Sequence, residues 1–263
     1  MRVYFVTLVS IVVAMCTTSA HAEFLNADSG YSGWTTFGSA FIGSSTVNGN
    51  GDGNNDGDID TMAGNAWGLN NRPNGPFNVD VSGVGYAFSQ GPLQVGQTLR
   101  IQMDTGVGED IAYAGAVGFQ LDSVDARMQF WYQPTMSVNY MLGMGAGPGP
   151  YNPEFDTGIP YTDEGLALSF ELLTAETYRF TATVLESGQT YVFDNRTLSS
   201  NYPGTPLASI NLFSIGNGEG VGRERAVYFN NLEIVPEPGT LGLLALGGMA
   251  LCATRRRASP TRS

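Results

Sequence analysis

The densest group of metal-binding side chains in the sequence lies between residues 50 and 60. Carboxylate and amide oxygens alternate with glycines there, at Asp52, Asn54, Asp56, Asp58 and Asp60. Calcium takes about six to eight oxygen ligands, and alternate residues of a tight loop can supply them. The spacing therefore predicts a Ca²⁺ loop of the DxNxDGxxD kind, which is the one cofactor site that the sequence indicates.

This loop is not a complete EF-hand. Ala63 stands where the bidentate glutamate would be, and no helix-forming segment flanks the loop. A calcium ion would therefore need a further carboxylate from elsewhere in the chain. The alternative interpretation is an acidic, glycine-rich turn that is solvated and binds no ion.

Aromatic side chains form the second candidate site. Trp34, Trp131 and Tyr132 are the residues whose ring faces we expect to stack on sugars. In a strand, Trp131 must point to the opposite face from its neighbours Phe130 and Tyr132. The alternative is that these rings pack in the core, as large aromatic side chains usually do.

Carboxylate pairs are the one arrangement in the sequence that could support catalysis, because a glycoside hydrolase needs only two. Asp156, Asp163 and Glu164 lie near one predicted turn, and Asp122 and Asp125 flank another. None of them forms the E-x-D-x-x-E strand pattern of sandwich-fold glucanases. Acidic residues in turns are usually surface charges, so no catalytic residue is assigned and a hydrolase remains the less favoured alternative.

The two ends of the chain have the composition of targeting segments. Residues 1–22 combine Arg2, an apolar run and a small-x-small cleavage site, which predicts a signal peptide cut before Glu23. Near the other end, residues 239–254 carry no charge and predict a short membrane helix, followed by three arginines that stay cytoplasmic. The remaining residues, 258–263, would form a cytoplasmic tail.

The segment between these ends, residues 23–234, contains no cysteine, histidine or lysine. This absence excludes a thiolate nucleophile, a Ser-His-Asp triad, a Schiff-base lysine and zinc sites built from histidine or cysteine. Seven arginines against 24 acidic residues leave residues 23–237 with a net charge of −17. Such a charge repels nucleic acid and suits hard cations.

Apolar side chains alternate with polar ones along much of this segment. Examples are Leu99 to Met103, Leu166 to Leu172 and Tyr178 to Val184, with turn residues between the runs. This period of two predicts antiparallel strands with one buried and one solvated face. About eight to ten strands in one domain predict an all-β, two-sheet sandwich of jelly-roll or lectin-like kind. A bulge is expected at Asn230-Asn231, where the alternation breaks.

The segment from Val235 to Arg257 resembles the PEP-CTERM sorting signal of bacterial proteins that an exosortase processes. Its carrying residues are Pro236, Glu237 and Pro238, the uncharged run after them, and Arg255, Arg256 and Arg257. The resemblance implies export, a transient stay in the inner membrane, and display on the cell surface or outside the cell.

The preceding segment is more loosely similar to exported β-sandwich domains found ahead of such tails. The similarity rests on Ile59-Asp60-Thr61, Trp67-Gly68-Leu69, Val95 to Thr98, Thr162 to Leu166 and Tyr228 to Leu232. It implies a non-catalytic protein associated with exopolysaccharide and biofilm formation. A structural coat protein without a ligand is the alternative.

Overall fold

The computed structural model describes residues 23–24, 33–38, 40–44, 65–69, 80–105, 115–123, 125–143, 153–162, 164–199, 202–216 and 227–235. The strands formed by these residues belong to one compact unit, Glu23–Ile234. The predicted signal peptide and the predicted hydrophobic helix lie outside the described residues.

The described residues form strands and no helix. The strands are β1 (Glu23–Phe24), β2 (Trp34–Phe37), β3 (Ala40–Ser44), β4 (Asn65–Leu69), β5 (Asp80–Ala87), β6 (Thr98–Thr105), β7 (Ala116–Asp122), β8 (Ala126–Tyr132), β9 (Asn139–Gly143), β10 (Pro153–Pro160), β11 (Leu166–Leu172), β12 (Thr177–Val184), β13 (Thr190–Thr197), β14 (Ser209–Gly216) and β15 (Val227–Val235).

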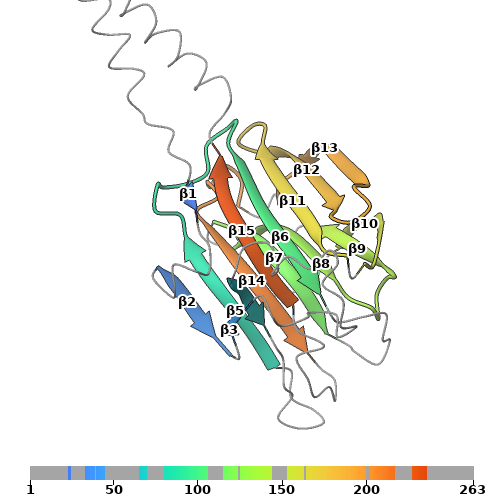
Figure 1. Ribbon diagram of the computed structural model, residues 1–263. Helices are drawn as coiled ribbons and strands as arrows, with labels where there is room; N and C mark the ends of the chain where they lie inside the picture. The colour runs from blue at the N-terminus through green and yellow to red at the C-terminus, as the bar shows by residue number, and fades with distance from the viewer. Residues whose placement is uncertain are drawn as a thin grey trace, which may run out of the picture. The chain divides into compact units, whose positions relative to one another are not determined.

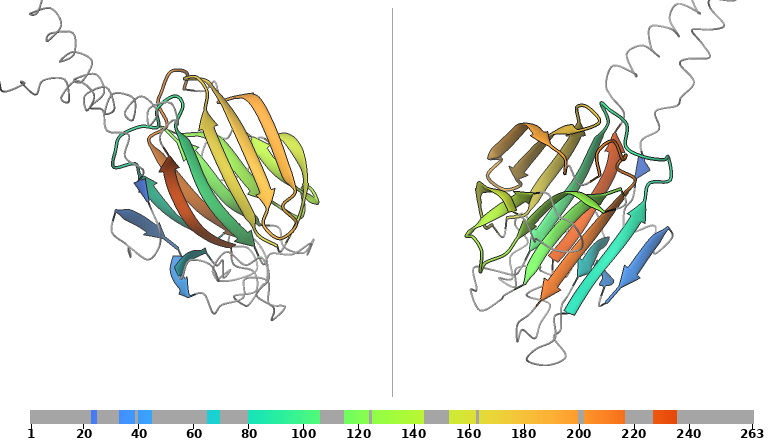
Figure 2. Two further views of the ribbon diagram at one scale, coloured as in Figure 1. Left: turned by 45° about the horizontal axis from the view of Figure 1, so that its top comes forward. Right: turned by 180° about the vertical axis from the view of Figure 1, so that it is seen from behind.

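These strands form two sheets, which lie against each other as two layers (Figures 1 and 2). The eight-stranded sheet has the order β13-β12-β11-β6-β15-β4-β3, with β1 paired to β15. The seven-stranded sheet has the order β10-β9-β8-β7-β14-β5-β2. Pairs such as β11 with β12 and β14 with β7 are antiparallel. The predicted all-β, two-sheet antiparallel sandwich is thus confirmed.

The core lies between the inner faces of the two sheets. Phe170 and Phe180 come from the eight-stranded sheet, and Phe119 and Phe130 from the seven-stranded one; all four are fully buried. The rings of Phe130 and Phe180 meet across the layers with their centroids 4.9 Å apart. Each such buried side chain stabilises the fold by about 1.5–3 kcal/mol.

The predicted alternation holds for the eight-stranded sheet, where successive residues of β11 and β12 are buried and half-buried in turn. It is wrong for the middle of the seven-stranded sheet, because every residue of β7 and β8 is buried. On the outer face of these two strands, Gln129 donates a hydrogen bond of 2.8 Å to Gln120, and Trp131 belongs to a second apolar cluster. A solvated outer face is therefore not general in this sandwich.

One end of the sandwich is closed by an ion pair between the two sheets. The fully buried side chain of Arg127, on β8, donates 2.5 Å hydrogen bonds to Glu176 and to the Thr205 carbonyl, and a longer one of 3.1 Å to the Ser199 carbonyl. Glu176 lies in the turn between β11 and β12 of the opposite sheet. The Gly204 N–H also donates to Glu176, and this hydrogen bond, with the Arg127 charge, lowers the pKa of the carboxyl group.

Candidate functional site

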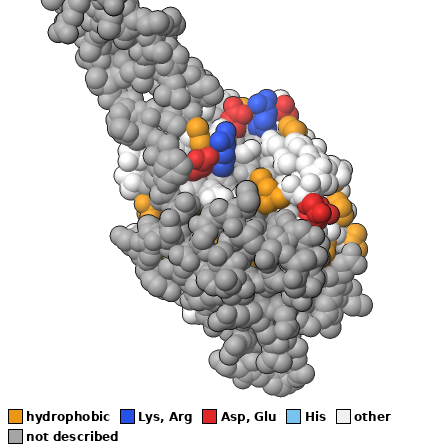
Figure 3. Space-filling view, viewed as in Figure 1, with side chains coloured by type: hydrophobic (Ala, Val, Ile, Leu, Met, Phe, Trp, Pro, Cys, Tyr) orange, Lys and Arg blue, Asp and Glu red, His pale blue; other side chains and the backbone are white. Residues whose placement is uncertain are grey.

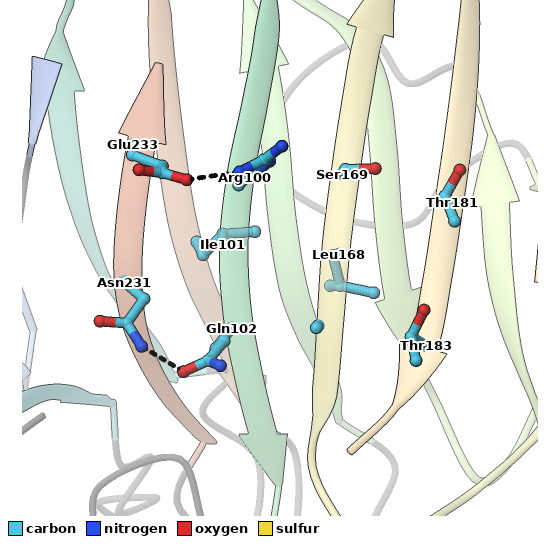
Figure 4. Close-up of a pocket in the computed structure, with 10 residues that line it drawn as sticks. Arg100, Ile101, Gln102, Leu168, Ser169, Thr181, Thr183, Asn231 and Glu233 are labelled. Carbon is cyan, nitrogen blue, oxygen red and sulfur yellow. Dashed lines mark hydrogen bonds and ion pairs between the residues drawn. The ribbon is translucent and has the colours of Figure 1, made fainter. Parts of the chain in front are cut away.

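A hollow of about 460 Å³ lies on the outer face of the eight-stranded sheet (Figure 4). Its walls and floor come from β6, β11, β12 and β15. The lining residues are Arg100, Ile101, Gln102, Ala167, Leu168, Ser169, Thr181, Thr183, Asn231 and Glu233.

The register of the strands produces this shape. On β11, Ala167 pairs with Gln102 on one side and with Thr183 on the other. Two residues along, Ser169 pairs with Arg100 and with Thr181 in the same way. Paired residues in a sheet point to the same face, so the small side chains of β11 form a floor between the longer side chains of β6 and the threonines of β12.

A bulge in β15 brings Asn231 into the hollow. Phe229 and Leu232 both belong to the core, so the alternation is shifted by one residue between them, and Asn231 adopts a φ of 49°. This confirms the expected bulge at Asn230-Asn231. The side-chain amide of Asn231 donates a 2.5 Å hydrogen bond to the side-chain oxygen, Oε1, of Gln102. Bulges commonly redirect a side chain in this way, and asparagine tolerates the left-handed conformation.

Arg100 and Arg179, which the structure describes on this face, are each bound to a carboxylate. The Arg100 Nη1 lies 3.1 Å from Glu233 Oε1 (Figure 4). Beyond the hollow, Arg179 donates to Asp194 at 2.8 and 3.3 Å and to Glu171 at 3.0 Å. Hydrogen bonding to Asp194 and its charge, followed by the charge of Glu171, raise the pKa of the Arg179 guanidinium. In Figure 3, each group of blue side chains on this face accordingly lies beside red ones.

The described lining of the hollow therefore offers hydroxyl groups, two amides and one ion pair, and it includes no aromatic ring. Hydroxyl and amide groups both donate and accept hydrogen bonds, which suits a ligand rich in hydroxyl groups. Sequence reasoning missed this site. The available signal was the set of polar residues at the outward positions of predicted strands, such as Arg100 and Gln102, together with the Asn230-Asn231 bulge.

The aromatic residues predicted to contact sugars are buried. Trp34 is 8% exposed, Trp131 0% and Tyr132 1%. Trp34 packs on Trp67 with ring centroids 5.3 Å apart, and Tyr132 packs on Tyr140 at 5.2 Å, both within the main core.

Trp131 does point away from the core as predicted, but it lies in a second apolar cluster with Ala116, Met141 and Phe213. None of the three predicted rings presents a face to solvent, so this prediction is corrected. The physical reason is that Trp34 and Tyr132 point into the core between the sheets, whereas Trp131 lies on an outer face that the seven-stranded sheet also buries.

The carboxylates considered for catalysis are not brought together in the hollow. Asp122 lies on β7 in the other sheet, where burial raises its pKa against the hydrogen bonds that it accepts from Gln120 and Asn211. For Asp156, slight desolvation is outweighed by hydrogen bonds from Ser137, Gly158 and Asn139, which lower its pKa. Both are held by structural hydrogen bonds.

Several predicted site residues cannot be compared with the structure. Asp163, the calcium loop from Asp52 to Asp60, and the sorting residues from Pro236 to Arg257 lie outside the described residues. Within the described part of the chain, no cluster of three or more acidic, histidine or cysteine side chains could hold a metal ion. Likewise, no helix among those residues is long and apolar enough to span a membrane.

Residues 235–257 match the model of the PEP-CTERM protein-sorting motif. The chain thus carries the predicted sorting signal, and this motif implies an exported protein that an exosortase processes at the membrane before surface display. No curated protein matches the chain.

Several solved structures are similar to this chain at low sequence identity. A legume lectin-like domain from Entamoeba histolytica is 12% identical, covers 84% of this chain and 98% of its own, and has a TM-score of 0.46. The CBM2 module of an evolved Dit protein from Lactobacillus casei BL23 phage J-1 is 14% identical, with coverages of 80% and 96% and a TM-score of 0.46. A carbohydrate esterase from a Shiga toxin-encoding bacteriophage is 14% identical, with coverages of 83% and 99% and a TM-score of 0.41. Similarity at this level does not assign a function.

Proposed function

We propose that this protein is an exported, exosortase-processed β-sandwich that binds exopolysaccharide without cleaving it, at the cell surface or in the extracellular matrix. The observation that carries the proposal is the open, polar hollow over β6, β11, β12 and β15. Its role would be adhesion: many copies of a rigid domain, each holding a segment of the same polymer, join cells and matrix.

The chemistry of the hollow supports a hydroxyl-rich ligand. Ser169, Thr181 and Thr183 present hydroxyl groups along the floor and one wall, and Gln102 and Asn231 present amides along the other. Sugar hydroxyls donate and accept hydrogen bonds, and these side chains do the same. The open shape suits a chain that enters and leaves the site rather than a small molecule enclosed in a pocket.

Binding without cleavage is supported by the ion pairs that the nearby carboxylates form. A glycoside hydrolase needs one carboxylic acid that stays protonated and a second carboxylate across the scissile bond. The acidic side chains near the hollow, Glu233, Glu171 and Asp194, each form an ion pair with an arginine and are held by that contact. They would therefore act as hydrogen-bond acceptors.

The targeting segments define the proposed domain organisation of the chain. Residues 1–22 are removed on export, residues 23–234 form the binding domain, and residues 235–257 form the sorting signal. The helix at about 239–254 would hold the unprocessed chain in the inner membrane, with residues 258–263 on the cytoplasmic side. Exosortase is then the processing partner, and nucleic acid is excluded as a partner by the acidic charge.

Calcium is part of the proposal as a structural ion. Asp52, Asn54, Asp56, Asp58 and Asp60 would order the loop that carries them, with the missing bidentate ligand supplied from elsewhere. Adding a chelator to the binding assay tests this component separately. Calcium-dependent retention would support the loop, and unchanged retention would remove calcium from the account.

The hollow itself is tested by filling it. The full chain, purified in mild detergent, is mixed with the producer's exopolysaccharide, and the protein that sediments with the polymer is measured. Ser169→Trp places a large ring over the floor, so retention should be lost while the thermal unfolding temperature stays near that of the parent. Thr35→Trp, at an exposed position on β2 of the other sheet, is the matched control and should bind as the parent does.

Loss of retention in both tryptophan variants would contradict a site at Ser169. Absence of retention for the parent chain would contradict polysaccharide binding altogether and would favour a structural coat protein.

A further inference from the structure

Resting on the proposed function, we infer that the hollow selects uncharged glycans and rejects uronate-bearing ones. The selection arises because the Arg100 guanidinium, which lines the hollow, is already bound to Glu233. A ligand is then recognised by neutral hydrogen-bonding groups alone.

The charges around the hollow offer no surplus of positive charge. Two arginines, Arg100 and Arg179, face three carboxylates, those of Glu233, Glu171 and Asp194. These five described side chains together carry one net negative charge, on a chain whose net charge is −12. A sugar carboxylate placed beside Arg100 would also lie close to Glu233, and the repulsion offsets the attraction.

Among the residues that the structure describes, none in the middle of the hollow has an ionisable side chain. Ala167, Ser169, Thr181 and Thr183 occupy adjacent positions on β11 and β12, and their side chains are uncharged. On the opposite wall, the Asn231–Gln102 hydrogen bond uses one amide donor and one acceptor, which leaves the other groups of both amides for a ligand. Binding by such groups should change little with salt, because salt screens interactions between charges.

Removing the carboxylate that neutralises Arg100 should reverse the selection. Glu233→Gln keeps the shape of the side chain and a hydrogen-bond acceptor, but it leaves the Arg100 charge uncompensated. Glu171→Gln removes the same charge from the same face, yet Arg179 keeps its two hydrogen bonds to Asp194. The two variants therefore have equal net charge and differ in whether an arginine has lost its ion pair.

The probe is the producer's exopolysaccharide, separated by anion exchange into a neutral and a uronate-bearing fraction. The full chain should be retained by the neutral fraction, with little change between about 50 and 500 mM NaCl. Glu233→Gln should gain about tenfold in affinity for the uronate-bearing fraction at low salt. Glu171→Gln should show no such gain.

Each contrary result has a distinct meaning. Preferential, salt-sensitive retention of the parent chain by the uronate-bearing fraction would overturn the inferred selectivity and leave polysaccharide binding intact. An equal gain in both glutamine variants would overturn the role of the Arg100–Glu233 pair, because net charge alone would then explain the effect. Retention by neither fraction would overturn both the inference and the proposed function.

Discussion

The two outer faces of this sandwich differ in what they bury. The outer face of the eight-stranded sheet carries short polar side chains and ion pairs that are half-buried or exposed, and it is hollowed over β11. The outer face of the seven-stranded sheet carries Trp131, Met141 and Phe213, each at most 6% exposed. The first face has the character of a binding surface, and the second that of an additional core.

Glycines explain how the second face accommodates large rings. Across five strands, the register places Phe37, Gly83, Phe213, Gly118 and Trp131 in one row. Glycine alternates with an aromatic residue, so a ring can extend over the neighbouring strand. A Cβ atom on Gly83 would overlap the Phe37 ring, which shows that the space above this glycine is already filled.

The same strand period of two therefore separates different environments in the two sheets. On β11 and β12, alternate positions separate core from solvent. On β7 and β8, alternate positions separate one packed layer from another. Substitutions at equivalent outward positions of the two sheets should therefore have unequal consequences.

The largest difference in unfolding free energy between the two faces is expected from substitutions that add side-chain volume. In Gly118→Val, the new Cβ would overlap the Phe130 carbonyl oxygen and lie 2.7 Å from the Trp131 Cα. These are backbone atoms that cannot move aside. Gly118→Val should therefore lower the unfolding free energy by more than about 4 kcal/mol or prevent folding. Ala167→Val adds bulk at the floor of the hollow and should change the unfolding free energy by less than about 0.5 kcal/mol.

Urea unfolding of both variants, followed by tryptophan fluorescence, measures this contrast. If Gly118→Val and Ala167→Val unfolded with similar free energies, the distinction between a packed face and an open one would be wrong.

A smaller difference in unfolding free energy is expected when the charge that is buried on the seven-stranded sheet is removed. The raised pKa of Asp122 means that the folded state binds this proton more tightly than the unfolded state. Its charged form therefore costs stability at neutral pH, and the cost disappears as pH falls through the raised pKa. At pH 7, the unfolding free energy of Asp122→Asn should equal that of the parent or exceed it by up to about 1 kcal/mol.

That advantage of Asp122→Asn should shrink as the pH is lowered. Asp156 and Glu176, whose pKa values are lowered, cause acid destabilisation in parent and variant alike, so their effects cancel in the difference. Unfolding free energies measured for both proteins from pH 7 to pH 4 give the comparison. A variant that is less stable by a constant amount at every pH would refute the cost assigned to the Asp122 charge.

Much of the fold could be predicted from the sequence, because apolar alternation and turn residues are local properties. The runs ending at Leu172 and Val184 proved to be β11 and β12, and the bulge at Asn230-Asn231 followed from a visible break in the alternation. The burial of Trp131 could not be predicted, since it depends on Met141 in the neighbouring strand β9 and on Phe213 in β14, which lies two strands away in the sheet. The strand register that brings these residues together is not apparent from their positions in the sequence.

The hollow could not be predicted for the same reason. Arg100 and Glu233 are 133 positions apart, and Gln102 and Asn231 are 129 apart. Each looks like an ordinary outward residue of a strand, and only the pairing of β11 with β6 and β12 shows that they surround a floor of small side chains.

The most direct test of the central claim is to locate bound polysaccharide on the two faces by thiol labelling. Cys16 and Cys252 are replaced by serine in the full chain, and a single cysteine is introduced as Ser169→Cys or as Thr35→Cys. The account predicts that exopolysaccharide slows labelling at position 169 and leaves position 35 unchanged. Protection at position 35, or none at position 169 while the protein is retained by the polymer, would contradict it.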